Sequence, residues 1–196
     1  RYLESAKRGV NRIGMIVQNL ADAASLEDAL EAEEFEVVNL FDLVQSYLAN
    51  CQTTHADRQF VYQGTHKPVK SNVSDYRIEQ LLDKLIDNAV DFSEAGSTIT
   101  VGLTTDADFL TLFVTNEGAL IPSDLVENIF DSMVSVRETN PDNRLHFGMG
   151  LYVVRVIAEY HGGSARASNL LNGKGVTIRI KLPLYKPVVQ KAFATG

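Results

Sequence analysis

Apolar side chains in the first thirty residues recur at alternating intervals of three and four positions. They are Leu3, Ala6, Val10, Ile13, Val17, Leu20 and Ala24. This heptad spacing predicts a helix with one narrow apolar stripe, which is typical of a coiled coil or of a helix in a bundle. A helix packed on its own domain, with an apolar residue about every 3.6 positions, is the alternative. We favour one arm of a helical hairpin that forms a homodimer.

Beyond residue 30, helical and strand periodicities follow one another. Alternation predicts strands at 35–40, 58–63, 97–103, 109–115, 164–168 and 175–182, and helical spacing predicts helices at 40–48, 75–92, 122–130 and 150–161. Residues 131–147 have no periodicity and contain Asn140-Pro141-Asp142-Asn143, which predicts a mobile loop. The order of elements predicts an α+β fold, a two-layer α/β sandwich in which helices cover one face of a mixed sheet.

The composition of the chain excludes several classes of protein and partner. The chain has 196 residues, of which 45% are apolar, enough for one sizeable domain with an appendage. Its 25 carboxylates against 18 Lys and Arg argue against a nucleic-acid partner. Single Cys51 excludes an internal disulfide framework. No apolar run reaches the roughly 20 residues of a membrane span, and no signal peptide opens the chain. Because the sequence begins inside a helical pattern, we expect a fragment of a longer protein.

Two features indicate a nucleotide with its metal. Asn88, near the end of the helix at 75–92, offers an amide oxygen, and Mg²⁺ prefers oxygen ligands with only one or two from the protein. Phe147-Gly148-Met149-Gly150-Leu151 opens the next predicted helix with two glycines, so backbone N–H groups can approach an anion. A surface Asn and an ordinary helix entry are the alternatives for each feature alone. Together they point to ATP with Mg²⁺.

Four motifs occur in a defined order: Asn88 in its helix, Asn116–Pro122, Ile129–Phe130 and Gly148–Leu151. This order resembles the N, G1, F and G2 boxes of the histidine-kinase ATP-binding domain, in the superfamily shared with gyrase, Hsp90 and MutL. The resemblance implies an ATP-binding catalytic domain at 31–187 and a C-terminal tail at 188–196. Residues 1–30 resemble the distal helix of the dimerisation and phosphotransfer hairpin. More narrowly, residues 129–137 with His161-Gly162-Gly163 are similar to the sensor kinase of proteobacterial dedicated sortase systems.

The resemblance implies a set of nucleotide-binding residues, with Asn88 also as the Mg²⁺ ligand. They are Lys84, Asn88, Asp91, Phe92, Asn116, Gly118, Ile121, Arg137, Gly148, Met149, Gly150, Leu151 and Thr177. The family's aromatic residue that Phe92 matches packs on adenine, and the threonine that Thr177 matches approaches the base through water. The resemblance also implies that Arg137 contacts phosphate from the loop. Ordinary roles stay open: Phe92 as a core residue, Thr177 as a good strand former and Arg137 as a solvated cation.

Four residues depart from the family pattern. Asn116 stands where Asp is usual, so the contact with the adenine amino group loses charge assistance, on the order of 1 kcal/mol. Leu120 replaces a glycine, and Asp91 stands where Lys often faces the phosphates. Lys84 stands where a metal-binding residue is usual, so direct contact with a phosphate oxygen and plain solvation are both open.

The resemblance implies delivery of the ATP γ-phosphate to a histidine on a hairpin helix mostly outside this chain, for relay to the receiver domain of a response regulator. The four histidines here lack the helical His-plus-acid pattern of a phosphoacceptor, so we assign no catalytic residue and expect no kinase turnover from this fragment alone. We further expect the cytoplasmic portion of a bacterial inner-membrane protein, attached through upstream segments. A degenerate, dimerising regulatory scaffold and an anti-sigma-type serine kinase are the alternatives.

Overall fold

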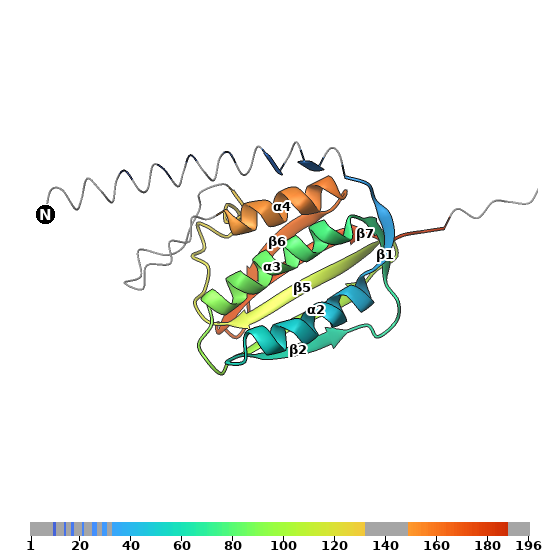
Figure 1. The fold of residues 1–196 in the computed structure, drawn as a ribbon. Coiled ribbons are helices and arrows are strands. Elements are labelled where there is room, and N and C mark those ends of the chain that lie inside the picture. Colours follow the sequence, from blue (N-terminus) through green and yellow to red (C-terminus); the bar gives the residue numbers. More distant parts are fainter. Residues whose placement is uncertain are drawn as a thin grey trace, which may run out of the picture.

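The computed structural model describes residues 33–131 and 149–187, together with Val10, Gly14, Val17, Ala21, Ser25, Leu26, Ala29 and Leu30 of the N-terminal segment, all helical. The labelled helices are α2 (Leu40–Thr54), α3 (Asp75–Asp91) and α4 (Gly150–Tyr160). The strands are β1 (Glu36–Asn39), β2 (Gln59–Gly64), β3 (Lys70–Val73), β4 (Thr98–Thr105), β5 (Phe109–Glu117), β6 (Ser164–Asn169) and β7 (Gly175–Pro183) (Figure 1). Within the described residues, no helix has the length and hydropathy needed to cross a bilayer.

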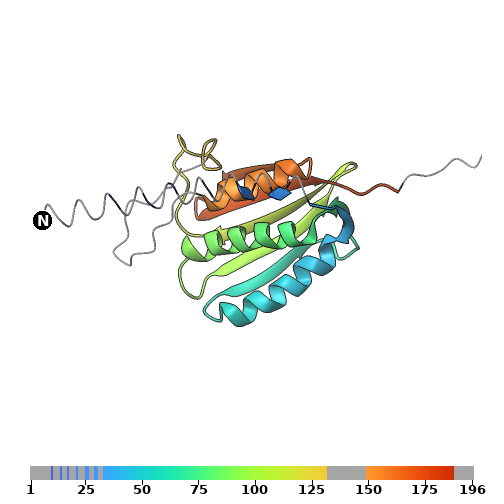
Figure 2. The same cartoon turned by 45° about the horizontal axis from the view of Figure 1, so that its top comes forward.

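Five strands form one mixed sheet in the order β2-β4-β5-β7-β6. β2 and β4 are parallel, whereas the other neighbouring pairs are antiparallel. α2, α3 and α4 cover one face of this sheet, with α3 between the other two (Figures 1 and 2). The parallel pair is possible because β3 and α3 supply the long crossover between β2 and β4. The α+β two-layer sandwich expected from the sequence is therefore confirmed.

The middle helix, α3, is held on the sheet by one apolar face. Its residues that are at most 2% exposed are Ile78, Leu81, Leu82, Leu85, Ile86 and Ala89. Their spacing of three and four places them on one side of a helix. Alternate residues of the strands, such as Ile99, Val101 and Val114, are buried in the same core. Full burial of one such side chain contributes about 1.5–3 kcal/mol, so this face anchors the helix.

Residues 122–130 differ from the expected short helix. They form successive turns, in which the N–H groups of Leu125, Asn128 and Asp131 each donate to the carbonyl three residues earlier. Each of these bonds closes a separate turn, and no ladder of i→i+4 bonds follows Pro122. The loop expected at 131–147 lies outside the described residues except for its first position.

β1 also differs from expectation, because it does not join the main sheet. It pairs antiparallel with β3 in a separate two-stranded sheet. β3 was not expected from the sequence, because one of its two inward positions is the polar residue Ser71. That side chain is buried and its Oγ donates to the carbonyl of Pro183 at 2.7 Å. Because the buried serine hydroxyl is hydrogen-bonded to a backbone group far away in the sequence, this short strand lacks the alternation of apolar residues that would predict it.

The N-terminal segment is fastened to α3 through Glu33. Its carboxylate accepts hydrogen bonds from Ser74 Oγ at 2.9 Å and from Arg77 Nε at 2.8 Å, and pairs with Arg77 Nη2 at 2.6 Å. Arg77 is only 8% exposed, so this ion pair is largely removed from water and depends on its hydrogen bonds. Leu26 and Leu30 are buried just before it in the sequence. Apolar burial and a satisfied ion pair therefore act together at this junction.

His161, which follows α4, belongs to the same junction. The side chain is buried, its Nε2 accepts the backbone N–H of Ser74 at 3.1 Å, and its Nδ1 lies 2.7 Å from the carbonyl of Ile157. A backbone N–H only donates and a carbonyl only accepts, so the imidazole is neutral with its proton on Nδ1. Burial is the main cause that lowers the pKa of His161, and the ring of Phe35 stacks on it with centroids 4.6 Å apart.

Acidification should therefore destabilise the domain through His161. Its pKa is lower in the folded protein than the ordinary value of 6.5, so the unfolded chain binds the proton first as the pH falls. This group has no effect well above pH 6.5 and lowers the free energy of unfolding below it, by up to about 1.4 kcal/mol per pH unit. Urea unfolding from about pH 8 to about pH 5 measures the effect. His161→Gln, which keeps an acceptor for Ser74 without titrating, should lose less stability; equal losses would contradict the assignment.

Candidate nucleotide-binding site

Three candidate residues lie on one stripe of α3. Lys84, Asn88 and Asp91 are spaced by four and three residues, and all three are half-buried. The adjacent stripe faces α2, where Asp83 accepts a hydrogen bond from Tyr47 Oη at 2.6 Å. At 100° per residue, Lys84 and Asn88 lie on the other side of the buried face from Asp83. Since α3 lies between α2 and α4 (Figure 2), this helix geometry directs them to the α4 side. No residue within the described ranges forms a hydrogen bond or ion pair with the side chains of Lys84 or Asn88. Both polar groups thus suit an external ligand.

The last turn of α3 is held by a buried arginine just before β2. Arg58 is 8% exposed; its Nη2 donates to the carbonyls of Val90 at 3.3 Å and Ser93 at 3.0 Å, and its Nε donates to Ser93 Oγ at 3.2 Å. These carbonyls lie at the negative end of the helix dipole, where a cation is favourable. Phe92 is the C-cap, half-buried, with its N–H on the carbonyl of Asn88 at 3.1 Å. Arg58 therefore supports the turn that carries two candidate residues.

Asn116 and Gly118 meet this end of α3 where β5 ends. Asn116 is 4% exposed, and its Nδ2 donates to the carbonyl of Glu117 at 3.2 Å. Gly118 has φ of +149°, and a Cβ there would lie 1.8 Å from the carbonyl oxygen of Phe92. Its N–H donates to the carbonyl of Lys174 at 3.0 Å. A side chain at Gly118 would therefore collide with the protein's own backbone before it reached any base.

The loop after β5 contains one exposed and one buried apolar residue. Leu120 is 41% exposed, whereas Ile121 is 7% exposed. The side chain of Asn169 in β6 bonds both backbone groups of Ile121, with Oδ1 accepting at 2.9 Å and Nδ2 donating at 2.8 Å. The structure therefore places the candidate residue Ile121 on the domain side of the loop. Asn169 was not expected from the sequence.

Thr177 is not brought together with the other candidates. In the β5–β7 pair, Thr177 is opposite Thr115 and Val176 is opposite Asn116. Successive strand residues point to opposite faces, so Val176 shares the helix-covered face with Asn116 and Thr177 lies on the other face. The two threonine hydroxyls are hydrogen-bonded at 2.8 Å. We therefore replace Thr177 by Val176 as the residue of β7 that borders the base pocket.

Within the described residues, the start of α4 has no side-chain cap. α3 is capped by the Ser74 side chain, whereas no side chain caps α4 after Met149. The first N–H groups of a helix without a cap need an acceptor, and an anion is the favoured one. A Cβ on Gly150 would meet no described atom within 4 Å, so the approach is open on that side; Met149 and Leu151 are half-buried.

Two further candidates, Arg137 and Gly148, lie outside the described residues, so their roles stay predictions. The segment that leads toward them is anchored. Ile129 and Phe130 are buried, and Asp131 Oδ1 pairs with Nη1 of Arg155 in α4 at 2.6 Å. The F-box residues therefore pack in the core beside α4, as the proposed motif order requires.

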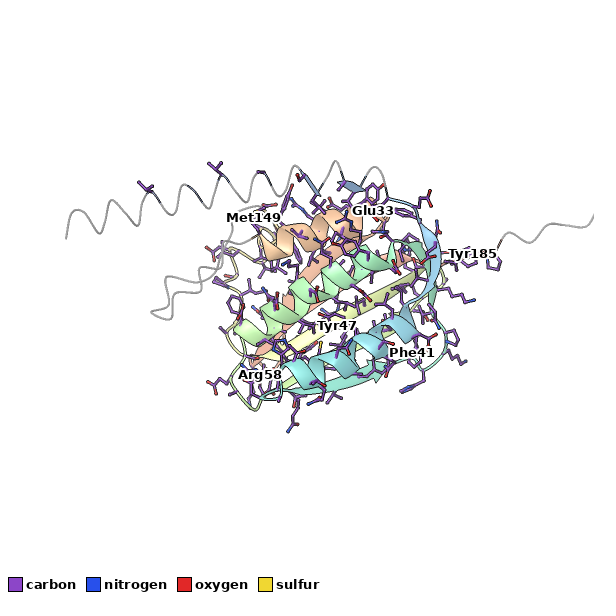
Figure 3. The ribbon with its side chains drawn as sticks, in the orientation of Figure 1. Glu33, Phe41, Tyr47, Arg58, Met149 and Tyr185 are labelled. Atoms are coloured by element: carbon purple, nitrogen blue, oxygen red, sulfur yellow. The ribbon has the colours of Figure 1, made fainter. Side chains whose placement is uncertain are left out.

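Apart from Thr177, the described candidates come from elements that meet at one end of the domain. Figure 3 shows Arg58 at the C-terminal end of α3 and Met149 at the start of α4, whereas Glu33 lies beside the other end of α4. The last turn of α3, the end of β5 and the first turn of α4 thus supply an amide, a base-side wall and open N–H groups. This combination suits a nucleotide whose phosphates point toward α4.

A family model described as "Histidine kinase-, DNA gyrase B-, and HSP90-like ATPase" matches residues 74–186. The matched range exceeds half of the chain and includes α3, β5 and α4. The chain belongs to this family of ATPases. The resemblance of its four motifs to the ATP-binding domain is thereby confirmed, and the ATPase family supports ATP as the nucleotide. The narrower likeness to sortase-system kinases stays a prediction.

Curated relatives of this chain are named as sensor proteins or histidine kinases. The signal transduction histidine-protein kinase ArlS of Staphylococcus haemolyticus is 26% identical over 163 residues, which cover 83% of this chain and 36% of ArlS. The sensor protein ChvG of Agrobacterium fabrum is 27% identical over 199 residues, which cover 97% of this chain and 33% of ChvG. The chain therefore spans about a third of the length of these relatives.

Solved structures share the fold. The nucleotide-free catalytic domain of histidine kinase ThkA has a TM-score of 0.67 at 23% identity, over 77% of this chain and 98% of that one. ThkA in complex with response regulator protein TrrA has a TM-score of 0.69 at 20% identity, over 94% of this chain and 51% of that one. At these identities the likeness shows the fold, which agrees with the observed sandwich.

Gly118→Ala and Gly150→Ala should distinguish a glycine at which a Cβ would clash from one at which a Cβ has space. At Gly118 the added methyl meets the Phe92 carbonyl and φ is unfavourable, so the free energy of unfolding should fall by roughly 1–3 kcal/mol. At Gly150 the methyl has space and alanine favours a helix, so stability should stay equal or rise by up to about 1 kcal/mol. Urea denaturation measures both. Equal losses in the two variants would contradict the distinction.

Proposed function

We propose that this chain is the ATP-binding catalytic portion of a two-component sensor histidine kinase, which delivers the γ-phosphate of ATP to a histidine on a hairpin helix mostly outside this chain. The observation that carries the proposal is the uncapped start of α4 beside the stripe of Lys84 and Asn88 on α3. Membership of the ATPase family and the naming of relatives as histidine kinases support it.

Helix α4 and the α3 stripe form the phosphate side. The first N–H groups of α4 would donate hydrogen bonds to phosphate oxygens, with Gly150 leaving the approach open. Lys84 would neutralise a phosphate oxygen directly, and Arg137 and Gly148 would complete this side. The amide oxygen of Asn88 would bind Mg²⁺, whose other ligands would be phosphate and water. Bound Mg·ATP supplies the transferable phosphoryl group and part of the charge neutralisation that its transfer requires.

The donor set fits a metal that arrives with the nucleotide. Among the described residues, no group of three or more His, Cys, Asp or Glu could hold a metal alone. Asp91 shares the stripe with Asn88 and adds a negative charge there, which opposes a triphosphate unless a cation is also bound. A single amide ligand beside a carboxylate therefore favours binding of the Mg²⁺ complex over the bare nucleotide.

The base side is formed by Asn116, Ile121 and Val176, with Phe92 at its edge. Because Nδ2 of Asn116 is engaged with the carbonyl of Glu117, Oδ1 is the atom offered to the adenine amino group. Ile121 and Val176 are less than 10% exposed and provide apolar surface for the ring. Small-ligand sites usually combine mostly apolar walls with a few polar groups that recognise the ligand.

In the whole protein, residues 1–30 would be the distal helix of the dimerisation and phosphotransfer hairpin, residues 31–187 the catalytic domain and residues 188–196 a tail. Val10 and Val17, one heptad apart, are 69% and 60% exposed, which leaves apolar positions for the helix of a second copy. A response regulator receiver domain would accept the phosphate. This portion would lie in the bacterial cytoplasm, joined to the inner membrane through other segments.

The regulatory scaffold and the anti-sigma-type serine kinase are not favoured, because several relatives are named as histidine kinases. The departures from the family pattern at Lys84, Asp91, Asn116 and Leu120 should therefore change the affinity for nucleotide and not the kind of activity. Substitutions at two positions test the two sides of the site separately.

Asn88→Ala should remove the part of nucleotide affinity that depends on Mg²⁺. Wild type should bind ADP about tenfold more tightly with Mg²⁺ than with a chelator, and the variant should show no such gain. Calorimetric titration measures both constants. Asn50→Ala, an exposed asparagine in α2, is the matched control and should behave as wild type. An unchanged gain in Asn88→Ala would contradict the metal role, and absence of ADP binding to wild type at millimolar concentration would contradict the proposed function.

Asn116→Asp should change stability and affinity in opposite directions. The carboxylate loses the donor to Glu117, so the melting temperature without ligand should fall. Its charge strengthens the hydrogen bond from the adenine amino group by about 1 kcal/mol, so adenosine and ADP should bind about fivefold more tightly. Thermal melts and a fluorescent ATP analogue measure the two effects. A lower melting temperature with unchanged or weaker affinity would remove Asn116 from the base pocket.

A further inference from the structure

Asn169, the last residue of β6, attaches the loop after β5 through its side chain. Its Oδ1 accepts the N–H of Ile121 at 2.9 Å and its Nδ2 donates to the carbonyl of the same residue at 2.8 Å. One amide side chain therefore satisfies both backbone groups of Ile121, as the backbone of a neighbouring strand would.

The attachment controls a short and otherwise exposed loop. At its start, the N–H of Gly118 bonds the carbonyl of Lys174 in the β6–β7 turn. Ala119 and Leu120 are exposed, and Ile121 returns to the domain with 7% exposure. The loop is thus held at two points of the β6–β7 hairpin, and Asn169 makes the second of them.

The same amide lies beside the base side of the site. Asn169 is opposite Val176 in the β6–β7 pair, and Val176 is opposite Asn116 in the β5–β7 pair. The three side chains therefore form a cross-strand row on the helix-covered face of the sheet. Asn169 ends this row and fixes the apolar residue that stands next to it, Ile121.

We propose that Asn169 is a positioning residue for the nucleobase: it holds Ile121 as a wall of the base pocket and takes no part on the phosphate side. The inference rests on the proposed function. Without the amide, the N–H and carbonyl of Ile121 lose their partners and turn to water, and the loop loses its second point of attachment. Binding of the base should weaken, whereas the contacts of α3 and α4 with phosphates and metal should remain.

Calorimetric titration of the full chain with adenosine, with ADP and with ADP plus Mg²⁺ tests this division. Asn169→Ala should bind adenosine and ADP about tenfold more weakly than wild type, with the ratio of the two affinities and the gain from Mg²⁺ unchanged. Asn172→Ala is the matched control: it lies in the same hairpin and its Oδ1 accepts the N–H of Lys174 at 3.0 Å, but it does not contact Ile121. It should retain wild-type affinities.

Three results would overturn the inference while the proposed function stands, provided that wild type binds ADP. They are an unchanged adenosine affinity in Asn169→Ala, an equal loss in Asn172→Ala, or a loss of the Mg²⁺-dependent gain. If Asn169→Ala does not fold, Asn169→Asp carries the same test, because its carboxylate still accepts the N–H of Ile121 but has no donor for the carbonyl. Failure of wild type to bind ADP would instead overturn the proposed function itself.

Discussion

Burial of the apolar face of α3 is the constraint on which the site depends. Because that face is packed on the sheet, the helix cannot rotate about its axis without exposing it to water. The rotation angle fixes Lys84 and Asn88 toward α4 and Asp83 toward α2. A rotation by one residue, about 100°, would bury charged side chains at a cost of several kcal/mol. The direction of the Asn88 amide, the proposed Mg²⁺ ligand, is therefore set by the packing of its neighbours.

Helices α3 and α4 connect two chemically different ends of the domain. At one end, Ser74 and Arg77 at the start of α3 meet Glu33 and His161, which follows α4. At the other end, the last turn of α3 lies near the uncapped start of α4. The two helices thus run in opposite directions, and each extends from the segment that bears Glu33 to the proposed nucleotide site. A shift of α3 relative to α4 at one end therefore moves the two helices relative to each other at the other end, because neither helix bends sharply without a proline or a bulge.

Periodicity predicted most of the fold, because the sheet and its helices are half buried and half polar. It failed where a polar group is buried, as with Ser71 in β3. For the proposed site, local motifs pointed to the amide and the glycine turns, but they could not show that Val176, and not Thr177, shares a face of the sheet with Asn116. A shift of one residue reverses the face of a strand, and only the pairing with β5 reveals which residue joins Asn116. Arg58 and Asn169 act on partners 32 to 48 positions away, so no local pattern marks them.

The glycines near the site satisfy two different physical requirements. A Cβ on Gly118 or Gly175 would lie 1.8 Å from the carbonyl oxygen of Phe92 or 2.1 Å from that of Asn116, so the protein itself fills these positions. A Cβ on Gly150 would meet no described atom within 4 Å, so that glycine leaves space for something else. The backbone of the proposed base side is therefore closely packed already, whereas the start of α4 is open within the described structure. When a base binds to a preformed surface, little binding free energy is spent on ordering the protein there. The contacts made at the phosphates then determine how tightly the metal complex is held.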